Sequence, residues 1–252
     1  MDDRLRTQQF ALLPVGEAAV LVEFGRDVSP AIQARVAALE QAIMKAEHKA
    51  IVEWVPTYRS LLVYYDLEQT SYPQMADWLS GLAAQGGDTQ AVPRRRITIP
   101  VLYGGPMGPD LDFVAEHTGL SPEDVIGRHE HPDYLVYMLG FMPGFPYLGG
   151  LDPRIVTPRL KTPRTLVPAG SVGIADRQTG VYPVNSPGGW QLIGRTPVRL
   201  YAPELADPIM LHPGDLLKFR SVSQAEYDQI AELVAQGRYQ PLVEEGVYYE
   251  QR

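Results

Sequence analysis

The fold of the second half of the chain depends on residues 141–197, which read FMPGFPYLGGLDPRIVTPRLKTPRTLVPAGSVGIADRQTGVYPVNSPGGWQLIGRTP. This turn-rich stretch holds nine Pro and nine Gly. A flexible linker with so much of both would be polar, but here bulky apolar residues recur between the turns. Pro and Gly fix turns between short extended segments. Such segments at close intervals predict a compact β-barrel or sandwich rather than alternating helices and parallel strands.

The turn-rich stretch is basic, although the protein as a whole is acidic. It contains five Arg and one Lys against two Asp, a net charge of +4, whereas the 252-residue chain carries −8. A local excess of positive charge among turns favours an anion-binding site. The isoelectric point of about 5.1 argues against nucleic acid as a partner, because such proteins need a broad basic face.

Composition also limits the cellular setting and the chemistry. The chain has no Cys, which excludes disulfides, thiol catalysis and zinc–thiolate sites and agrees with a reducing compartment. No apolar run approaches the roughly 20 residues that cross a bilayer, and the first ten residues, MDDRLRTQQF, lack the apolar core of a signal peptide. We therefore expect a cytoplasmic protein without a membrane partner.

Residues 1–84 are expected to form a small α+β sandwich domain. Residues 10–24 and 50–66 each contain two strand-like segments, and a helix is predicted after each pair. The first helix begins at Ser29-Pro30, a Ser N-cap followed by Pro at the first helical position. The second helix is predicted over residues 71–82. This order predicts a sheet with one helix-covered face.

Residues 85–94 are expected to be a linker, because they include the sequence QGGDTQ. Residues 95–252 then form the β-barrel domain. Short helices are predicted at 110–118 and 121–128, and a C-terminal helix at 223–237. Further strands are predicted in PVRLYAP (197–203) and LLKFR (216–220), and the tail is expected to be ordered only if it docks on something.

Three Pro-Arg pairs recur every five residues in the turn-rich stretch, at Arg154, Arg159 and Arg164. Proline stiffens the backbone before each Arg, which suits the bidentate capture of a carboxylate or phosphate. A period of five matches neither a strand nor a helix, so the three side chains need not converge. The alternative is a solvated loop whose Arg residues pair with acidic side chains.

A serine hydrolase is not expected. Gly170-Ser171-Val172-Gly173 is preceded by Ala169, where a nucleophile elbow needs Gly, and the turn-rich stretch contains no His to act as base. Backbone amides near Ser171 and near Gly188-Gly189 can still form an anion cradle. The sequence has no GxxxxGK and no GxGxxG, so it offers no standard nucleotide site.

His129-Glu130-His131 is the only spacing that suggests a metal. Alternating His residues of this kind more often lie at an exposed helix end and face solvent, which is what we expect for His129 and His131. Two His without further clear ligands do not complete a site, so we expect no metal. Phe141, Phe145, Tyr182 and Trp190 are expected to be mainly barrel core, with one or two able to wall a pocket at the rim.

Long segments of the chain resemble the KipI/PxpB family. In the second half these are GFMPGFPYLGGLDP, TPRTLVPAGSVGIADRQTGVYPVNSPGGWQLIGRTP and HPGDLLKF, and earlier ones are PTYRSLLVYYD, IPVLYGG and LDFVAEHTGLSPEDVI. The family includes the B subunit of bacterial 5-oxoprolinase (PxpB), the Kip inhibitor of a sporulation histidine kinase, and proteins called allophanate hydrolase subunit 1. Related paired domains form the carboxyltransferase part of urea carboxylases.

The resemblance implies an N-terminal α+β domain, a C-terminal cyclophilin-like β-barrel, and two partner subunits, one PxpC/KipA-like and one LamB/YcsF-like. The implied activity is the ATP-dependent hydrolysis of 5-oxo-L-proline to L-glutamate. ATP is used by the complex, the site is shared with the PxpC/KipA-like partner, and this chain alone is expected to be inactive. No catalytic residue is assigned. The expected substrate or anion contacts are Arg159, Arg164, Ser171, Gln178, Thr179, Tyr182, Asn185, Ser186, Gly188, Gly189, Trp190 and Arg195.

Two alternatives remain open from the sequence. The protein can be a regulator that binds the dimerisation domain of a histidine kinase, with the barrel surface as an interface and no chemistry. A weaker alternative is a role in a urea- or allophanate-related carboxyltransferase or hydrolase.

Overall fold

The computed structural model describes residues 10–85 and 94–246. Residue contacts divide the chain into two compact units, residues 1–92 and 93–252. Of the predicted linker, residues 86–93 lie outside the described ranges. None of the helices within those ranges is long and apolar enough to cross a membrane.

The first unit contains a four-stranded antiparallel sheet in the order β1-β2-β4-β3. Its strands are β1 (Ala11–Val15), β2 (Ala19–Glu23), β3 (Ile51–Pro56) and β4 (Ser60–Tyr65). The four strands occur where the sequence predicts them.

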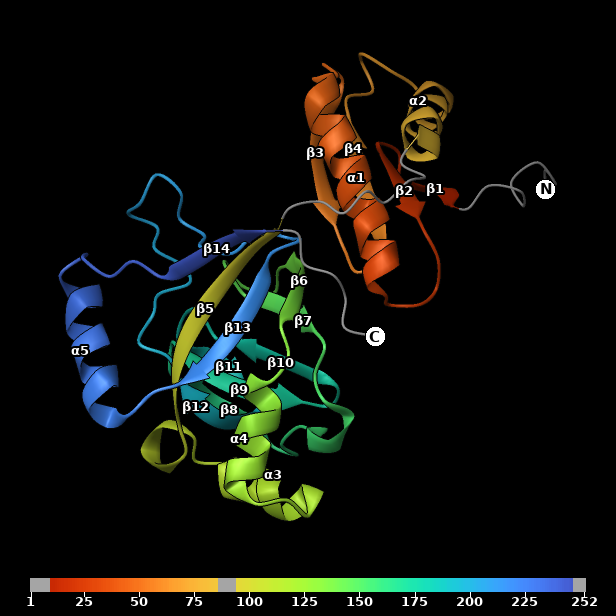
Figure 1. Ribbon diagram of the computed structural model, residues 1–252. Coiled ribbons are helices and arrows are strands. Elements are labelled where there is room, and N and C mark those ends of the chain that lie inside the picture. The colour runs from red at the N-terminus through yellow and green to blue at the C-terminus, as the bar shows by residue number, and fades with distance from the viewer. Residues whose placement is uncertain (1–9, 86–93, 247–252) are drawn as a thin grey trace. The chain divides into compact units, whose positions relative to one another are not determined.

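Two helices, α1 (Pro30–Ala46) and α2 (Tyr72–Gln85), pack against this sheet (Figure 1). Ser29 caps α1, because its hydroxyl accepts a hydrogen bond of 3.3 Å from the Ile32 N–H. Val36 and Leu39 are buried in one core with Val63 of β4. The predicted strand–strand–helix order, repeated twice, is therefore confirmed.

The second unit is built on an eight-stranded sheet that curls into a barrel. The strand order is β10-β9-β12-β5-β13-β6-β7, and β14 pairs with the first half of β5. The strands are β5 (Arg94–Tyr103), β6 (Tyr134–Leu139), β7 (Pro146–Gly149), β9 (Ser171–Ala175), β10 (Gln178–Val181), β12 (Gln191–Arg195), β13 (Leu216–Ser221) and β14 (Leu242–Gly246).

The two end strands of this order, β10 and β7, lie side by side, so the barrel is nearly closed. A Cβ added to Gly180 in β10 would lie 3.4 Å from the carbonyl oxygen of Pro146 in β7. A separate two-stranded ribbon pairs β8 (Arg164–Val167) with β11 (Ser186–Gly188). The predicted class, α+β with a barrel in the second half, is confirmed.

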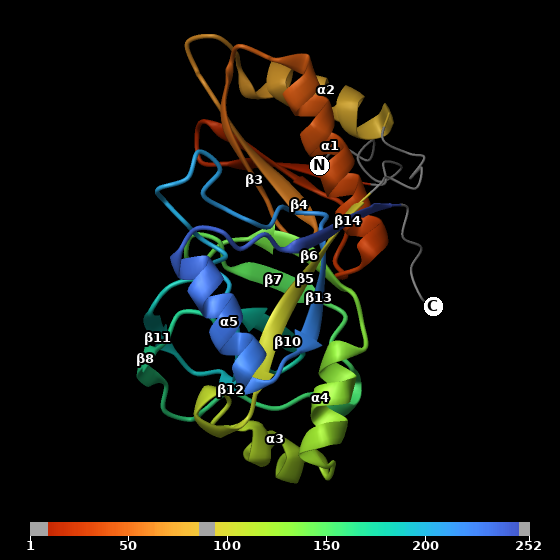
Figure 2. The same ribbon diagram turned by 60° about the vertical axis from the view of Figure 1, so that its left-hand side comes forward.

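Three helices flank the barrel: α3 (Leu111–Thr118), α4 (Pro122–Glu130) and α5 (Gln224–Ala235). Figure 2 shows α3 and α4 together at one end of the barrel and α5 beside β5. Ser121 and Ser223 cap α4 and α5 by accepting hydrogen bonds from backbone N–H groups three residues later. Short 3-10 turns occur at η2 (Gly105–Met107) and η3 (Pro153–Ile155).

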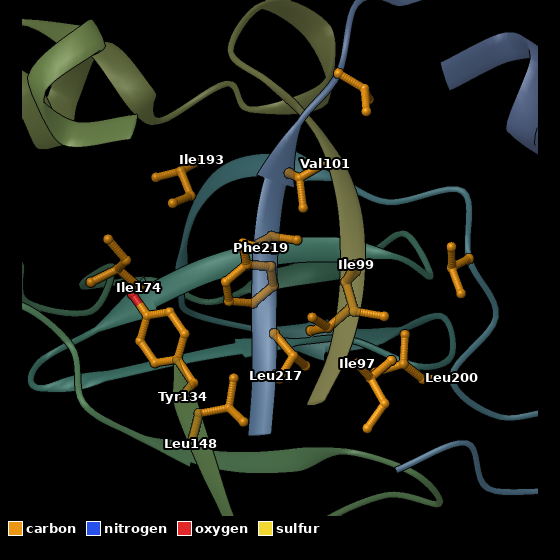
Figure 3. Packing of buried hydrophobic residues seen from close by; sticks show 14 of the residues in the cluster. Ile97, Ile99, Val101, Tyr134, Leu148, Ile174, Ile193, Leu200, Leu217 and Phe219 are labelled. Carbon is orange, nitrogen blue, oxygen red and sulfur yellow. The ribbon is translucent and has the colours of Figure 1, made fainter. Parts of the chain in front are cut away.

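The barrel interior is a single apolar core (Figure 3). Phe219 from β13 and Tyr134 from β6 lie at its centre, with Ile174 from β9 and Ile193 from β12 beside them. Each fully buried side chain of this size contributes about 1.5–3 kcal/mol of hydrophobic stabilisation. The predicted alternation of turns and bulky residues therefore yields a packed core around which the loops are held.

One expectation needs correction. Residues 197–203 do not form a strand: their backbone pairs with the loop at 208–210, through an isolated bridge between Tyr201 and Ile209 and hydrogen bonds such as Met210 N–H to Leu200 O. The C-terminal tail meets the expected condition for order up to Gly246, because Leu242–Gly246 dock on the chain's own sheet and pair with β5 as β14. Residues 247–252 lie outside the described ranges.

Candidate functional site

A cavity of about 210 Å³ opens in the second unit, entirely between parts of the turn-rich stretch. Six residues that the sequence singles out as substrate contacts line it: Arg159, Gln178, Tyr182, Gly188, Gly189 and Trp190. Six further lining residues are not among those predicted contacts: Phe141, Phe145, Tyr147, Leu160, Pro163 and Pro187. Leu160, Pro163 and Pro187 stand directly beside predicted Arg or Gly residues in the sequence, a signal that could have indicated them. Phe141 and Phe145 are among the aromatic residues expected to be able to wall a pocket.

Four aromatic rings form one wall of the cavity, which we call the aromatic floor: Phe145, Tyr147, Tyr182 and Trp190. The Phe145 ring centroid lies 5.4–5.7 Å from the centroids of the other three, always edge to face. Such pairs are favourable because the positive edge of one ring meets the negative face of the next. The prediction of barrel core holds for the burial of Phe145, Tyr182 and Trp190 but not for their place: they form a small cluster of their own, apart from the barrel core, and line the cavity.

Phe141 differs from this prediction. Its side chain is 75% exposed at the cavity rim, although it too makes an edge-to-face contact with Phe145, at 6.0 Å between ring centroids. The residue is therefore rim and not core.

Gly188 comes very close to the Tyr182 ring of the aromatic floor. A Cβ added there would lie 2.9 Å from Cε1 and Cζ of Tyr182, closer than real Cβ atoms approach other atoms. A Cβ added at Gly189 would instead make ordinary contacts of 3.6 Å or more with Pro163. The absence of a side chain at Gly188 is thus required by the close approach of the Tyr182 ring.

Burial raises the pKa of the Tyr182 hydroxyl, an effect opposed by a hydrogen bond from the Trp190 backbone and by the positive charges of Arg159 and Arg164. The hydroxyl therefore keeps its proton at neutral pH. Among the described residues we find no acceptor for that proton. A ligand in the cavity can accept it.

Arg159 is the basic residue that lines the cavity. Its Nε donates a 3.3 Å hydrogen bond to Oδ2 of Asp176, in an ion pair whose side chains are 54% and 62% exposed. An exposed pair of this kind contributes about 0–1 kcal/mol. A ligand anion can therefore compete with Asp176 for the guanidinium group.

The other two Arg residues of the Pro-Arg series form ion pairs with Asp residues of the protein. Arg154 pairs with Asp152 at 2.8 Å. Arg164 donates from Nη2 to Oδ1 of Asp110 at 2.7 Å and from Nη1 to the carbonyl oxygen of Trp190 at 3.2 Å. Asp110 and Arg164 are mostly buried, at 12% and 28% exposure, so this pair joins the start of α3 to the cavity wall.

Four more of the predicted contacts support the loops around the cavity without lining it. Arg195 donates from Nε to the carbonyl oxygen of Ala169 at 2.8 Å, and the Oδ1 of Asn185 accepts from the Ala169 N–H at 2.8 Å. Ser171 is buried at the start of β9. Ser186, in β11, has a buried hydroxyl oxygen without a hydrogen-bond partner among the described residues.

Thr179 belongs to a buried hydrogen-bond chain inside the barrel. Its hydroxyl donates to the carbonyl oxygen of Gly173 at 3.1 Å and lies 2.7 Å from Nε2 of His129. Nδ1 of His129 lies 2.8 Å from the hydroxyl of Tyr103. Burial raises the pKa of Tyr103, so its hydroxyl donates to Nδ1, and we assign the imidazole proton to Nε2.

His129 is fully buried and stacked on Phe219, with ring centroids 4.5 Å apart. Burial lowers its pKa from 6.5 to about 3, so the ring is neutral. The expectation of an exposed helix end is wrong for His129 although right for His131. Across residues 10–85 and 94–246, no group of three or more His, Asp or Glu side chains is placed to hold a metal ion.

Comparison with known proteins identifies the relatives of this chain. It is 40% identical over 232 residues to the B subunit of 5-oxoprolinase from Bacillus subtilis (strain 168), covering 88% of this chain and 96% of that protein. It is 44% identical over 207 residues to the B subunit of 5-oxoprolinase from Escherichia coli O157:H7, covering 81% and 93%. Residues 10–211 match the family described as carboxyltransferase domain, subdomain C and D. The chain belongs to this carboxyltransferase domain family.

Solved structures of related proteins agree with this carboxyltransferase domain. The crystal structure of TTHA0988 is 38% identical with a TM-score of 0.73, covering 81% of this chain and 40% of that one, so the present chain spans less than half of TTHA0988. The Kluyveromyces lactis urea amidolyase is 23% identical with a TM-score of 0.78 over 95% of this chain and 16% of that protein, a likeness of fold. All residues lining the cavity fall within the part that matches the family.

Proposed function

We propose that this protein is the B subunit of a multi-subunit, ATP-dependent 5-oxoprolinase that converts 5-oxo-L-proline to L-glutamate. The observation that carries the proposal is the identity of 40–44% with proteins named as that subunit, whose length it covers by 93–96%. Likeness along almost the whole of both chains favours a shared role over a shared fold alone.

The cavity supports a small substrate. Its volume of about 210 Å³ lies below the roughly 300–1,000 Å³ typical of sites for drug-sized ligands. A five-membered ring amide with one carboxylate is of suitable size, whereas a nucleoside triphosphate is not. The apolar faces of the aromatic floor suit the ring carbons, and polar groups at the rim suit the carboxylate and the amide.

Four polar groups at the cavity have a role in this proposal. Arg159 binds the substrate carboxylate in place of Asp176. The Tyr182 hydroxyl donates to an oxygen of the substrate, and the backbone N–H groups of Gly188 and Gly189 stabilise negative charge that develops on the amide oxygen. Arg164 and Arg195 hold the surrounding loops through the contacts described above.

The reaction needs groups from outside this chain. A phosphoryl group passes from ATP to the amide oxygen, which releases ADP. One water adds to the activated carbon, and the ring C–N bond breaks to leave the free amine and an acyl phosphate. A second water hydrolyses the acyl phosphate to the carboxylate and phosphate. The sequence contains no nucleotide motif, so we assign ATP binding to the complex, within a cytoplasmic assembly. The partners are a PxpC/KipA-like subunit, which shares the site, and a LamB/YcsF-like subunit.

The test is reconstitution of the three subunits and measurement of ATP-dependent glutamate release from 5-oxoproline. We expect release to require this chain. We expect Arg159→Ala to lower kcat/KM about 10–100-fold, because a hydrogen bond to a charged group is worth about 1.5–3 kcal/mol. Arg177→Ala is the matched control, because Arg177 is an exposed Arg next to Asp176 that does not line the cavity.

Glutamate release that persists without this chain would refute the proposal. The histidine-kinase alternative makes the opposite forecast: this chain binds the kinase dimerisation domain and adds nothing to glutamate release. Both can be measured with the same purified protein.

A further inference from the structure

Phe141 has a backbone conformation that its side chain disfavours. Among the described residues, three that are not Gly have positive φ: Glu47 at 45°, Asp176 at 53° and Phe141 at 65°. Glu47 caps the end of α1 and Asp176 lies in the two-residue turn between β9 and β10, places where polar residues often adopt this conformation. For a bulky residue such as Phe it is an outlier that costs free energy.

The loop between β6 and β7 fixes this conformation. The Gly140 N–H donates to the carbonyl oxygen of Phe145 at 3.1 Å, and the Phe145 N–H donates to that of Met142 at 3.1 Å. Gly144, with φ of 77°, lies so close to the next loop that a Cβ there would be 3.3 Å from the carbonyl oxygen of Leu200. Phe141 is thus held in place by its neighbours on both sides.

Packing does not compensate for the strain. The Phe141 side chain is 75% exposed, and its one ring contact is the edge-to-face pair with Phe145. Strained residues that the surrounding structure enforces are concentrated at ligand clamps and active sites. Phe141 also lines the cavity, together with Gly188 and the aromatic floor.

We infer that Phe141 is a substrate-contacting residue whose ring covers the flat ring of the bound cyclic amide from the open side of the cavity. The inference rests on the proposed function for the identity of that ligand. A phenyl ring presents a rigid apolar face and loses little conformational freedom on contact. The substrate ring then lies between Phe141 and the aromatic floor, and water is kept from its open face.

The experiment compares Phe141→Asn with Phe141→Tyr in the reconstituted complex. Asn adopts positive φ more readily than Phe and removes the ring, whereas Tyr keeps the ring and the strain. We expect Phe141→Asn to raise the Tm of the isolated chain while raising the KM for 5-oxoproline about 5–10-fold, with kcat nearly unchanged. Phe141→Tyr should retain the wild-type KM and Tm.

Phe113→Asn on α3 is the matched control, since Phe113 is also an exposed Phe but lies outside the cavity lining. It should leave KM unchanged. The inference would be overturned if Phe141→Asn had the wild-type KM or a lower Tm than wild type. It would also be overturned if Phe141→Asn no longer bound the other subunits, because the ring would then be an interface contact. A wild-type complex without glutamate release would instead refute the proposed function itself.

Discussion

Replacing Gly188 with Ala tests how rigid the aromatic floor is. The new methyl group would lie 2.9 Å from two ring carbons of Tyr182 and closer still to its hydroxyl oxygen. The Tyr182 ring cannot turn away easily, because it is buried between Phe145 and Trp190 at centroid distances of 5.7 and 6.0 Å. Either the ring or the β11 backbone has to move by several tenths of an ångström.

Overpacking of this kind typically costs about 1–3 kcal/mol. The loss of backbone freedom in the unfolded chain on changing Gly to Ala offsets about 0.4–1 kcal/mol of that cost. We therefore expect Gly188→Ala to lower the free energy of unfolding of the second unit by up to about 2.6 kcal/mol, and by about 1.3 kcal/mol at the middle of both ranges. Gly189→Ala is the control: its methyl group makes ordinary contacts with Pro163, so its stability should be unchanged or slightly raised.

The assay is native-state hydrogen exchange of the slowest amides in β9 and β12, which reports on the barrel separately from the first unit. The variant with Tyr182→Phe added lacks the hydroxyl oxygen and should recover part of the lost stability, since contacting residues couple. If the Gly188→Ala variant were as stable as the Gly189→Ala variant, Tyr182 would be free to move. That result would contradict the inference that the aromatic floor of the cavity is rigid.

Two further predictions concern charged and titratable groups. Arg164→Ala should lower the free energy of unfolding, measured by urea titration, by about 1–3 kcal/mol, because Asp110 is left mostly buried without its Arg partner. Arg159→Ala should leave the free energy of unfolding within about 0.5 kcal/mol of wild type. Equal effects of the two substitutions would contradict the division into a structural Arg164 and a ligand-binding Arg159. Burial lowers the pKa of His129 to about 3, so below pH 6.5 His129 binds a proton in the unfolded chain but not in the folded chain. Between about pH 6 and 4, His129 therefore lowers the free energy of unfolding by up to about 1.4 kcal/mol per pH unit as the pH falls. His129→Gln should flatten this pH dependence in urea titrations more than His131→Gln does, and identical slopes would contradict the buried neutral ring.

Local signals in the sequence are enough to place the helices. Ser29, Ser121 and Ser223 each begin a helix where predicted, because capping depends on neighbours within one turn. The segment at 197–203 fails as a strand because strand formation requires a partner. Its alternation of buried and exposed residues is real, but none of the barrel strands that the structure describes pairs with it. The sequence pattern carries no information about that pairing.

The candidate site is predictable where it depends on residue type and not where it depends on distant partners. Gly188 and Trp190 are indicated by the mixture of turns and aromatic residues. The structural contacts of Arg164 and Arg195 are not indicated by the sequence. Arg164 donates to Asp110, 54 residues earlier, and Arg195 donates to the backbone of Ala169. The prediction for His129 is wrong for the same reason, since the barrel that buries it is assembled from segments far from it in sequence.

The net charge of the turn-rich stretch therefore overstates the positive charge available to a ligand. Arg154, Arg164 and Arg195 all have firm acceptors within the protein, and the acid on Arg164 comes from outside the stretch. Arg159 alone among these four both lines the cavity and has only an exposed acid as partner. Exchange of Asp176 for a substrate carboxylate replaces one ion pair by another and costs little. Under the proposed function, we expect a site with one such cation and an apolar floor to select a small molecule with a single carboxylate, and the more highly charged phosphates of ATP to be neutralised by groups outside this cavity.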